Sequence, residues 1–372
     1  MTRLRGARLD ELELPLVTPF VTSFGSTRRR RFLVLSLRSH SGETGIAECV
    51  AAVEPLYSGE TVETVRSLLV HRFLPALLRE PVVDLRRWAR VSAPVRGNPM
   101  AKALVEMALH DLVAREAGVS LAHHLGGRRQ RVEVGVSVGI QKDVPSLLRV
   151  VGRYLDQGYC RIKLKVRPGW DAVPVRAVRR QFPDVRLWVD ANQAYPSGAA
   201  DRIADWAERA GVEQVEQPFD ERAIRAHARL QRGRRFRVCL DESVVDRASL
   251  GDAIGARALQ SLNVKPGRVG GHDPSVALSR LAAVSSIPSW VGGMLESGIG
   301  RAHLLALASR PEFTLPADIS ASSRYYAHDL TDPPFTLGPA STIAVPRGGG
   351  LGVSIDPRRY RHAVRRTSRY RR

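Results

Sequence analysis

The chain has 372 residues, 44% of them apolar and 25% charged, which suits one large and one smaller folded domain and excludes a chain that is disordered throughout. It contains no run of about 20 apolar residues and no apolar segment typical of a signal peptide, so we expect neither a membrane partner nor export. Its formal net charge of +20 leaves nucleic acid or an anionic surface open as a partner.

The first 128 residues predict a small α+β domain. Residues 8–55 have the pattern of strands, interrupted by a Gly-, Ser- and Thr-rich loop that we expect over 19–31. Helices are expected over 60–79 and 98–118, because apolar residues recur there at helical spacing. Strands followed by helices favour a compact α+β arrangement.

From residue 129 on, short β-branched segments alternate with stretches long enough for a helix. This alternation predicts a (β/α)8-type barrel over residues 129–320 and therefore an α/β fold class. An open doubly wound sheet is the alternative, but no GxGxxG phosphate loop follows the first strand. The candidate strands are 132–140, 160–166, 185–192, 212–218, 236–243, 259–266, 287–294 and 313–318.

The end of the chain is strongly basic. We expect residues 321–356 to return to the first domain and residues 357–372 to form a disordered tail, which holds eight arginines and no acid. Such a block can bind nucleic acid. Because it lacks helical amphipathy and a recognisable nucleic-acid module, we interpret it as solvated and consider a nucleic-acid partner unlikely.

The three cysteines, Cys49, Cys160 and Cys239, are widely spaced and form no CxxC pair. We interpret them as reduced thiols in the core. This interpretation favours a cytoplasmic location.

Lysine is rare in this chain. Only five of the 57 basic residues are lysine, and three of these, Lys163, Lys165 and Lys265, lie on predicted barrel strands. An ammonium group can lose its proton near neutral pH whereas a guanidinium cannot, so a lysine kept in an arginine-rich chain is a candidate base. Lys163 and Lys165 are two residues apart on one strand, so both face the barrel interior.

An acid ends each of the three strands that follow. The steps from Lys165 through Asp190, Glu216 and Asp241 to Lys265 are 25, 26, 25 and 24 residues, or one β/α unit each. Because the carboxyl ends of barrel strands share one mouth, these side chains are expected to converge. Three carboxylates in one pocket repel one another unless a hard cation joins them, and an all-oxygen ligand set favours Mg²⁺, with Mn²⁺ as a substitute.

This set of residues predicts the removal of a proton next to a carboxylate. Burial, a second ammonium and the metal are expected to lower a lysine pKa to that of a working base, while the metal stabilises the negative charge that develops. Lysines on two sides permit either an elimination on one face or a racemisation across two faces. We expect Asn192 and Gln217 to orient the ligands, and Asp220 and Glu242 to be ordinary polar neighbours.

Several segments resemble the muconate-lactonising subgroup of the enolase superfamily, and more narrowly its o-succinylbenzoate synthase / N-acylamino acid racemase family. The segments KLK, VDANQAY, VEQP, LDES and NVKPGRVGG are similar to the catalytic strands of the subgroup, and GVSVGI, MAKALVEMALHD and GGMLESGIGR look like the narrower family. The resemblance covers about residues 8–355. It implies an enolase-like two-domain fold in which an α+β domain caps a modified, TIM-like barrel.

The resemblance also implies roles for individual residues. Asp190, Glu216 and Asp241 would bind Mg²⁺, and Lys165 and Lys265 would act as acid and base from two sides. The remaining candidates are expected to contact the substrate: Lys163, Ser137, Asn192, Gly293, Met294, Phe20, Tyr57 and Tyr325.

The activity that this resemblance favours is o-succinylbenzoate synthase, a carbon–oxygen lyase that dehydrates a succinyl-hydroxycyclohexadiene carboxylate in menaquinone biosynthesis. The alternative is an N-succinyl- or N-acylamino acid racemase, in which Lys165 and Lys265 both act as bases. A distant alternative is a non-catalytic nucleic-acid-binding protein. The expected partners are a small-molecule carboxylate substrate and further copies of the chain in a homo-oligomer.

Three positions depart from the family pattern, namely Ala52, His110 and Tyr325. They affect the pocket shape or the domain interface rather than the metal. The segment from Asp318 lacks the DxD of related dipeptide epimerases, which argues against binding of a free ammonium there. Four histidines of the first domain have no partner pattern for a catalytic triad or a zinc site, and we expect them to be packing or surface residues: His71, His110, His123 and His124.

Overall fold

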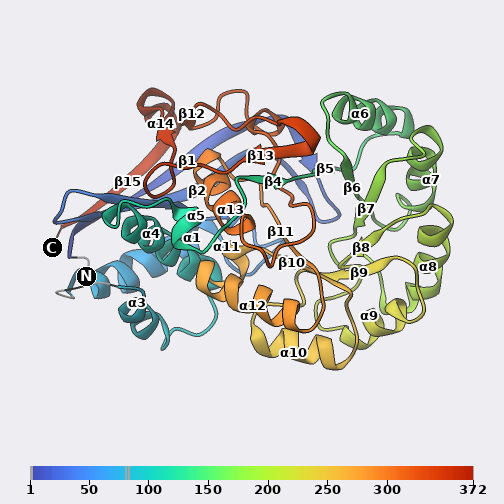
Figure 1. Cartoon of the computed structure of the whole chain (residues 1–372), viewed down its shortest axis with the longest axis horizontal. Coiled ribbons are helices and arrows are strands. Elements are labelled where there is room, and N and C mark those ends of the chain that lie inside the picture. Colours follow the sequence, from blue (N-terminus) through green and yellow to red (C-terminus); the bar gives the residue numbers. More distant parts are fainter. Residues whose placement is uncertain (1–2, 80–81, 83, 372) are drawn as a thin grey trace.

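The computed structural model describes residues 3–79, 82 and 84–371. A four-stranded antiparallel sheet in the order β15-β1-β2-β3 and a seven-stranded parallel sheet in the order β11-β10-β9-β8-β7-β6-β5 organise the chain. Figure 1 shows the antiparallel sheet beside the helices of the N-terminal half and the parallel sheet curving inside an outer layer of helices. The structure confirms the predicted α/β fold class with a separate α+β unit.

The N-terminal unit packs helices against one face of the antiparallel sheet. Leu33, Leu35 and Leu37 alternate along β2 and enter a core that also contains Leu104 and Leu112 of α4. Its elements are β1 (Leu4–Val21), β2 (Ser26–Ser39), β3 (Thr44–Glu48), α1 (Val62–Leu68), a π-helical turn (Leu69–Phe73), α2 (Leu74–Arg79), α3 (Leu85–Ser92), α4 (Pro99–Glu116) and α5 (Leu121–His124).

The prediction of a long loop over residues 19–31 is wrong. The pairs Phe20↔Thr27 and Val21↔Ser26 extend the β1–β2 hairpin, so only residues 22–25 lie between the two strands. Serine and threonine are tolerated at these positions because β-branched and small polar residues fit a strand that is solvated on one face.

The barrel unit alternates parallel strands with helices. Its strands are short and buried, as expected where both faces of a parallel sheet are covered. The elements are β4 (Arg131–Glu133), β5 (Val136–Val138), α6 (Val144–Asp156), β6 (Arg161–Lys165), α7 (Ala172–Gln181), β7 (Arg186–Asp190), a 3₁₀ turn (Ser197–Ala199), α8 (Ala200–Arg209), β8 (Gln214–Glu216), α9 (Ile224–Gln231), β9 (Arg237–Leu240), α10 (Arg247–Gly255), β10 (Ser261–Val264), α11 (Pro266–Val269), α12 (His272–Val284), β11 (Ser289–Val291) and α13 (Gly298–Ala308).

The two outermost predicted strands differ from expectation. The segment 132–140 divides into β4, which pairs antiparallel with β13 (Thr342–Ala344), and β5, which joins the barrel sheet. The segment 313–318 makes only isolated parallel bridges, Ser289↔Phe313 to one edge of the sheet and Val134↔Ala317 toward the other. Pro316 lies in this segment and has no N–H for a regular ladder.

The prediction that residues 357–372 form a disordered tail is wrong for the described residues. This part forms a helix and a strand that pairs antiparallel with β1, as Figure 1 shows. The elements after the barrel are a 3₁₀ turn (Ser322–Arg324), β12 (Thr331–Asp332), a second 3₁₀ turn (Pro339–Ser341), β13, β14 (Ser354–Ile355), α14 (Pro357–Ala363) and β15 (Val364–Arg371).

Acidic side chains of β1 hold this basic segment. Tyr360 Oη donates to Asp10 Oδ2 at 2.8 Å, Thr367 Oγ1 donates to Asp10 Oδ1 at 2.6 Å, and Arg365 Nη1 lies 2.9 Å from Glu13 Oε1. Asp10 is fully buried. The partners lie some 350 residues away in the chain, so the composition of the segment alone could not reveal them.

Two further expectations concern the core and the membrane. Cys49 and Cys239 are buried free thiols, but Cys160 is exposed. The prediction of a core thiol is therefore wrong at Cys160, which lies in the connection between α6 and β6. No helix within the described ranges has the length and apolar character needed to cross a membrane.

We predict that Tyr360→Phe destabilises the protein by about 1–2 kcal/mol, because it removes a hydrogen-bond donor from a buried carboxylate. The urea midpoint of unfolding measures the effect. Tyr370→Phe, on the same basic segment, is the matched control. Equal midpoints for the two variants would show that Asp10 does not depend on Tyr360.

Candidate active site

The predicted catalytic residues lie at the carboxyl ends of neighbouring parallel strands. Lys165 is paired in register with Asp190, and Asp190 is paired with Glu216, so the last residues of β6, β7 and β8 lie in one row. Asp241 directly follows β9 and Lys265 directly follows β10. The topology therefore brings together residues that are separated by about 100 positions in the chain.

Each carboxylate is held by a different ammonium. Lys165 Nζ lies 2.6 Å from Asp190 Oδ2, Lys163 Nζ lies 2.6 Å from Glu216 Oε2, and Lys265 Nζ lies 2.5 Å from Asp241 Oδ2. All six residues are buried. Pairing is required here, because an isolated charge in a buried site is strongly unfavourable.

Polar residues next to the acids fix their positions. Asn192 accepts a hydrogen bond from Lys165 Nζ at 2.7 Å, and its Nδ2 donates to Glu242 Oε1 at 3.1 Å. The Gln217 side-chain oxygen accepts from the backbone N–H groups of Asp241 and Ser243. Asn192 and Gln217 both adopt positive φ, 43° and 36°, a strained backbone that often occurs at functional sites.

Glu242 differs from its expected role. It is buried and bonded to Asn192, whereas Asp220 is exposed, as expected of a surface neighbour. Burial and the nearby Asp241 carboxylate raise the pKa of Glu242 to about 8, and burial together with Asp190 raises the pKa of Glu216 to about 7. Both carboxyl groups therefore hold their proton to a higher pH than an exposed glutamate does.

Lys163 and Lys265 do not show the lowered pKa that the sequence predicts. Burial lowers the pKa of Lys163 and Lys265, but the carboxylates of Asp318 and Asp241 respectively outweigh this effect and raise both values above normal. The expectation rests on burial, a second ammonium and the metal. In the structure each of these two ammonium groups also lies against a carboxylate.

A cavity of about 310 Å³ opens over these residues and is lined by both parts of the chain. Among its lining residues, Phe20 and Tyr57 come from the N-terminal unit and Lys265 from the barrel, and Lys265 Nζ donates to Tyr57 Oη at 3.1 Å. The structure brings all the predicted substrate-contacting residues to this cavity, namely Lys163, Ser137, Asn192, Gly293, Met294, Phe20, Tyr57 and Tyr325.

Asp318 is a member of the site that the sequence did not single out. Its carboxylate lies 2.5 Å from Lys163 Nζ and 2.5 Å from Arg161 Nη1, and it accepts a hydrogen bond from Ser137 Oγ at 3.0 Å. Its position at the end of the eighth barrel segment was the available signal.

The predicted metal ligands are not the tightest cluster of ligand atoms. Within the described residues, the group of three that meets within 4.8 Å is Glu106, His110 and Asp273, outside this cavity. The oxygens of Asp190 and Glu216 are instead engaged by lysines, so their role as ligands stays a prediction. The sequence missed the second cluster, although Glu106 and His110 stand four residues apart on one helix face.

Comparisons with known proteins agree with this architecture. Residues 7–126 match the family "Mandelate racemase / muconate lactonizing enzyme, N-terminal domain", and residues 146–359 match "Enolase C-terminal domain-like". A solved member of the enolase superfamily from Listeria innocua is similar with a TM-score of 0.94 and 36% identity over 100% of both chains.

Curated relatives carry two kinds of name. An N-succinylamino acid racemase from Amycolatopsis is 45% identical over 95% of this chain and 96% of its own length. An o-succinylbenzoate synthase from Geobacillus stearothermophilus is 40% identical over 94% of this chain and 93% of its own length. On this evidence the chain belongs to the mandelate racemase / muconate lactonizing enzyme family of the enolase superfamily and is an enzyme.

Proposed function

We propose that this enzyme removes the proton α to the carboxylate of a small substrate that carries a succinyl group. The observation that carries the proposal is the placement of two lysines on one cavity. Both line it: Lys165 ends β6 and Lys265 directly follows β10. Between these strands lie β7, β8 and β9, at whose carboxyl ends the three acids stand. A base on each side of a bound substrate is the arrangement that racemisation requires.

Racemisation of an N-succinylamino acid is therefore our first candidate. The relatives from Amycolatopsis and Thermus thermophilus that bear this name are 45% and 44% identical to the chain. Synthesis of o-succinylbenzoate is the second candidate, favoured by relatives of that name at 35–40% identity. That dehydration needs one base, for which Lys165 is the proposed residue, and Lys265 would then contribute positive charge.

The charge of the cavity suits a substrate with two carboxylates. Residues 28–31, a run of four arginines on β2, contribute to its lining. Arg29 and Arg31 are paired with glutamates of β1, and Arg30 donates to backbone oxygens. The exposed Arg28 is therefore the proposed partner of the terminal carboxylate of a succinyl group. Lys163, which also lines the cavity, is the proposed partner of the carboxylate next to the reacting carbon.

Enzymes of this superfamily act with Mg²⁺, and the residues here fit such an ion. Asp190, Glu216 and Asp241 would hold it, as an all-oxygen set that suits a hard cation. Glu242 Oε2 and Asn263 Oδ1 are buried acceptors without a hydrogen bond in the described structure, which suits a cation or its water ligands nearby. When bound, Mg²⁺ or Mn²⁺ supplies charge stabilisation for the substrate carboxylate as its α-proton leaves.

The chain's own residues perform the remaining steps. Lys165, oriented by Asn192, would take the α-proton on one face, and Lys265, oriented by Tyr57, would return a proton on the other. The homo-oligomer, the cytoplasmic location and the lack of a nucleic-acid partner stay predictions.

We predict that Lys165→Arg lowers turnover by at least about a thousandfold in both the racemisation and the dehydration assay, because the charge remains but the titratable amine is lost. Lys265→Arg should abolish racemisation yet still exchange the α-proton of one enantiomer with solvent deuterium. Proton NMR in D₂O measures both effects. Full racemisation by Lys265→Arg would remove the two-base assignment.

We predict that Asp241→Asn weakens Mg²⁺ activation more than about a hundredfold, because it removes a charged oxygen ligand. Activity as a function of Mg²⁺ concentration measures this change. Asp220→Asn, an exposed acid near the same mouth, is the matched control. If the two variants show the same Mg²⁺ dependence, Asp241 is not a ligand.

We predict a pH-dependent effect of Glu242→Gln on metal-free protein. Between pH 4.5 and about 8 the unfolded chain is ionised at Glu242 while the folded chain keeps its proton, so wild-type stability falls as pH rises, by up to about 1.4 kcal/mol per pH unit. The variant lacks this loss. Its advantage in thermal stability should therefore grow from pH 5 to pH 8 in EDTA, and exposed Glu63→Gln should show no such trend. A constant difference across this range would contradict the raised pKa.

A further inference from the structure

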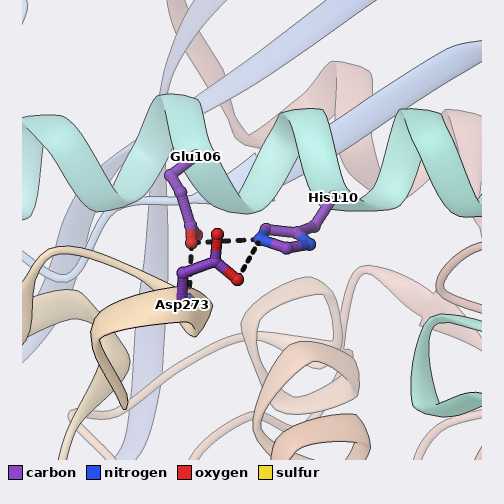
Figure 2. Close-up of side chains that lie close together, drawn as sticks. All are labelled: Glu106, His110 and Asp273. Atoms are coloured by element: carbon purple, nitrogen blue, oxygen red, sulfur yellow. Dashed lines mark hydrogen bonds and ion pairs between the residues drawn. The ribbon is translucent and has the colours of Figure 1, made fainter. Parts of the chain in front are cut away.

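A second cluster of metal-ligand side chains lies where the N-terminal unit meets the barrel. Glu106 and His110 come from one face of α4, and Asp273 comes from the first turn of α12. Figure 2 shows the three side chains pointing toward one another between the two helices. Glu106 and His110 are buried, whereas the Asp273 side chain is 65% exposed.

The spacing of the ligand atoms is already that of a metal site. His110 Nε2 lies 3.1 Å from Glu106 Oε1 and 3.4 Å from Asp273 Oδ1, and all three atoms lie within 4.8 Å of one another. Tetrahedral ligands bonded to zinc at about 2.0–2.1 Å are separated by about 3.3 Å. An ion could therefore enter with little movement of the side chains.

A second histidine fixes the orientation of the imidazole. His110 Nδ1 lies 3.0 Å from Nε2 of His124, a residue of α5. With Nδ1 engaged in this hydrogen bond, Nε2 faces the two carboxylates. A metal-bound histidine in proteins commonly has its other ring nitrogen engaged in this way.

The cluster is accessible from solvent. A cavity of about 460 Å³ is lined by Glu106 and Asp273 together with Trp88, Lys102 and Gly270. An ion can reach the carboxylates through it, and water can complete the coordination. This cavity shares none of its lining with the one that holds Lys165 and Lys265.

We propose that Glu106, His110 and Asp273 form a binding site for a divalent transition-metal ion of the Zn²⁺ type, distinct from the catalytic carboxylates. One imidazole nitrogen and two carboxylate oxygens suit Zn²⁺ or Co²⁺, whereas Mg²⁺ prefers oxygen ligands alone. Because the ligands come from α4 and α12, a bound ion joins the N-terminal unit to the barrel.

The same contacts also have an explanation without a metal. Glu106 caps α12 by accepting the backbone N–H groups of His272 and Asp273, each at 2.7 Å. A protonated His110 then bridges the two carboxylates: burial lowers its pKa, but Glu106 and Asp273 outweigh this and raise it to about 10. Direct metal binding separates the two explanations.

The experiment uses the full chain in excess MgCl₂, so that the catalytic carboxylates do not bind the added ion. Zn²⁺ is titrated by calorimetry, and Co²⁺ is followed by its visible absorption. His110→Gln and Asp273→Asn remove one ligand each. Substitution of the exposed Asp273 disturbs the packing less than substitution of the buried His110. Glu106 is left intact because it caps α12. His123→Gln, an exposed histidine of α5, is the matched control.

We expect wild type and His123→Gln to bind one Zn²⁺ per chain in the presence of Mg²⁺, with a rise in the unfolding temperature that Mg²⁺ alone does not give. Asp273→Asn should bind at least about tenfold more weakly and His110→Gln at least about a hundredfold more weakly. The proposal would be overturned if the wild type bound no Zn²⁺ in excess Mg²⁺. It would also be overturned if both ligand variants bound Zn²⁺ as tightly as the wild type.

Discussion

The active site depends on burying ammonium and carboxylate groups as pairs at one edge of a parallel sheet. Lys165 with Asp190, Lys163 with Glu216 and Lys265 with Asp241 are each in contact at 2.5–2.6 Å. Removing one partner of such a pair would leave an uncompensated buried charge, which is far more costly than the pair itself. The parallel register β6–β7–β8 satisfies this constraint because it places the last residue of each strand beside that of the next.

The N-terminal unit contributes contacts to the cavity and to the ends of barrel helices. Tyr57 hydrogen-bonds to Lys265, and Ser23 Oγ donates to the backbone oxygen of Asn192, so two residues of this unit contact the catalytic edge. Two of its carboxylates cap barrel helices: Glu48 accepts from the N–H of Ser297 at the start of α13, and Glu106 caps α12. Negative charge at a helix N-terminus is favourable, so these contacts hold the unit over the cavity while they stabilise the barrel.

Several arginines of this arginine-rich chain make contacts within the fold. Arg365 pairs with Glu13 of β1, Arg161 lies buried between Asp318 and Trp188, and Arg30 donates to the backbone oxygens of Cys49 and Ala51. A guanidinium has several donors in a fixed plane and therefore bonds to several acceptors where an ammonium would bond to fewer. Three of the five lysines line the cavity, where the proposed function requires a group that can lose its proton.

The sequence by itself determined the β/α alternation of the second unit and predicted which side chains meet at its carboxyl edge, because an ionisable residue recurs at neighbouring strand ends at a spacing of 24–26 residues. A pattern of this kind can be recognised in the sequence without knowledge of the fold. Only the tertiary structure decided which ammonium faces which carboxylate, that Glu242 and Asp318 are buried in the site, that residues 364–371 pair with β1, and that Glu106 and His110 meet Asp273. Each of these depends on a contact between residues far apart in the chain, and neither composition nor periodicity carries information on such contacts.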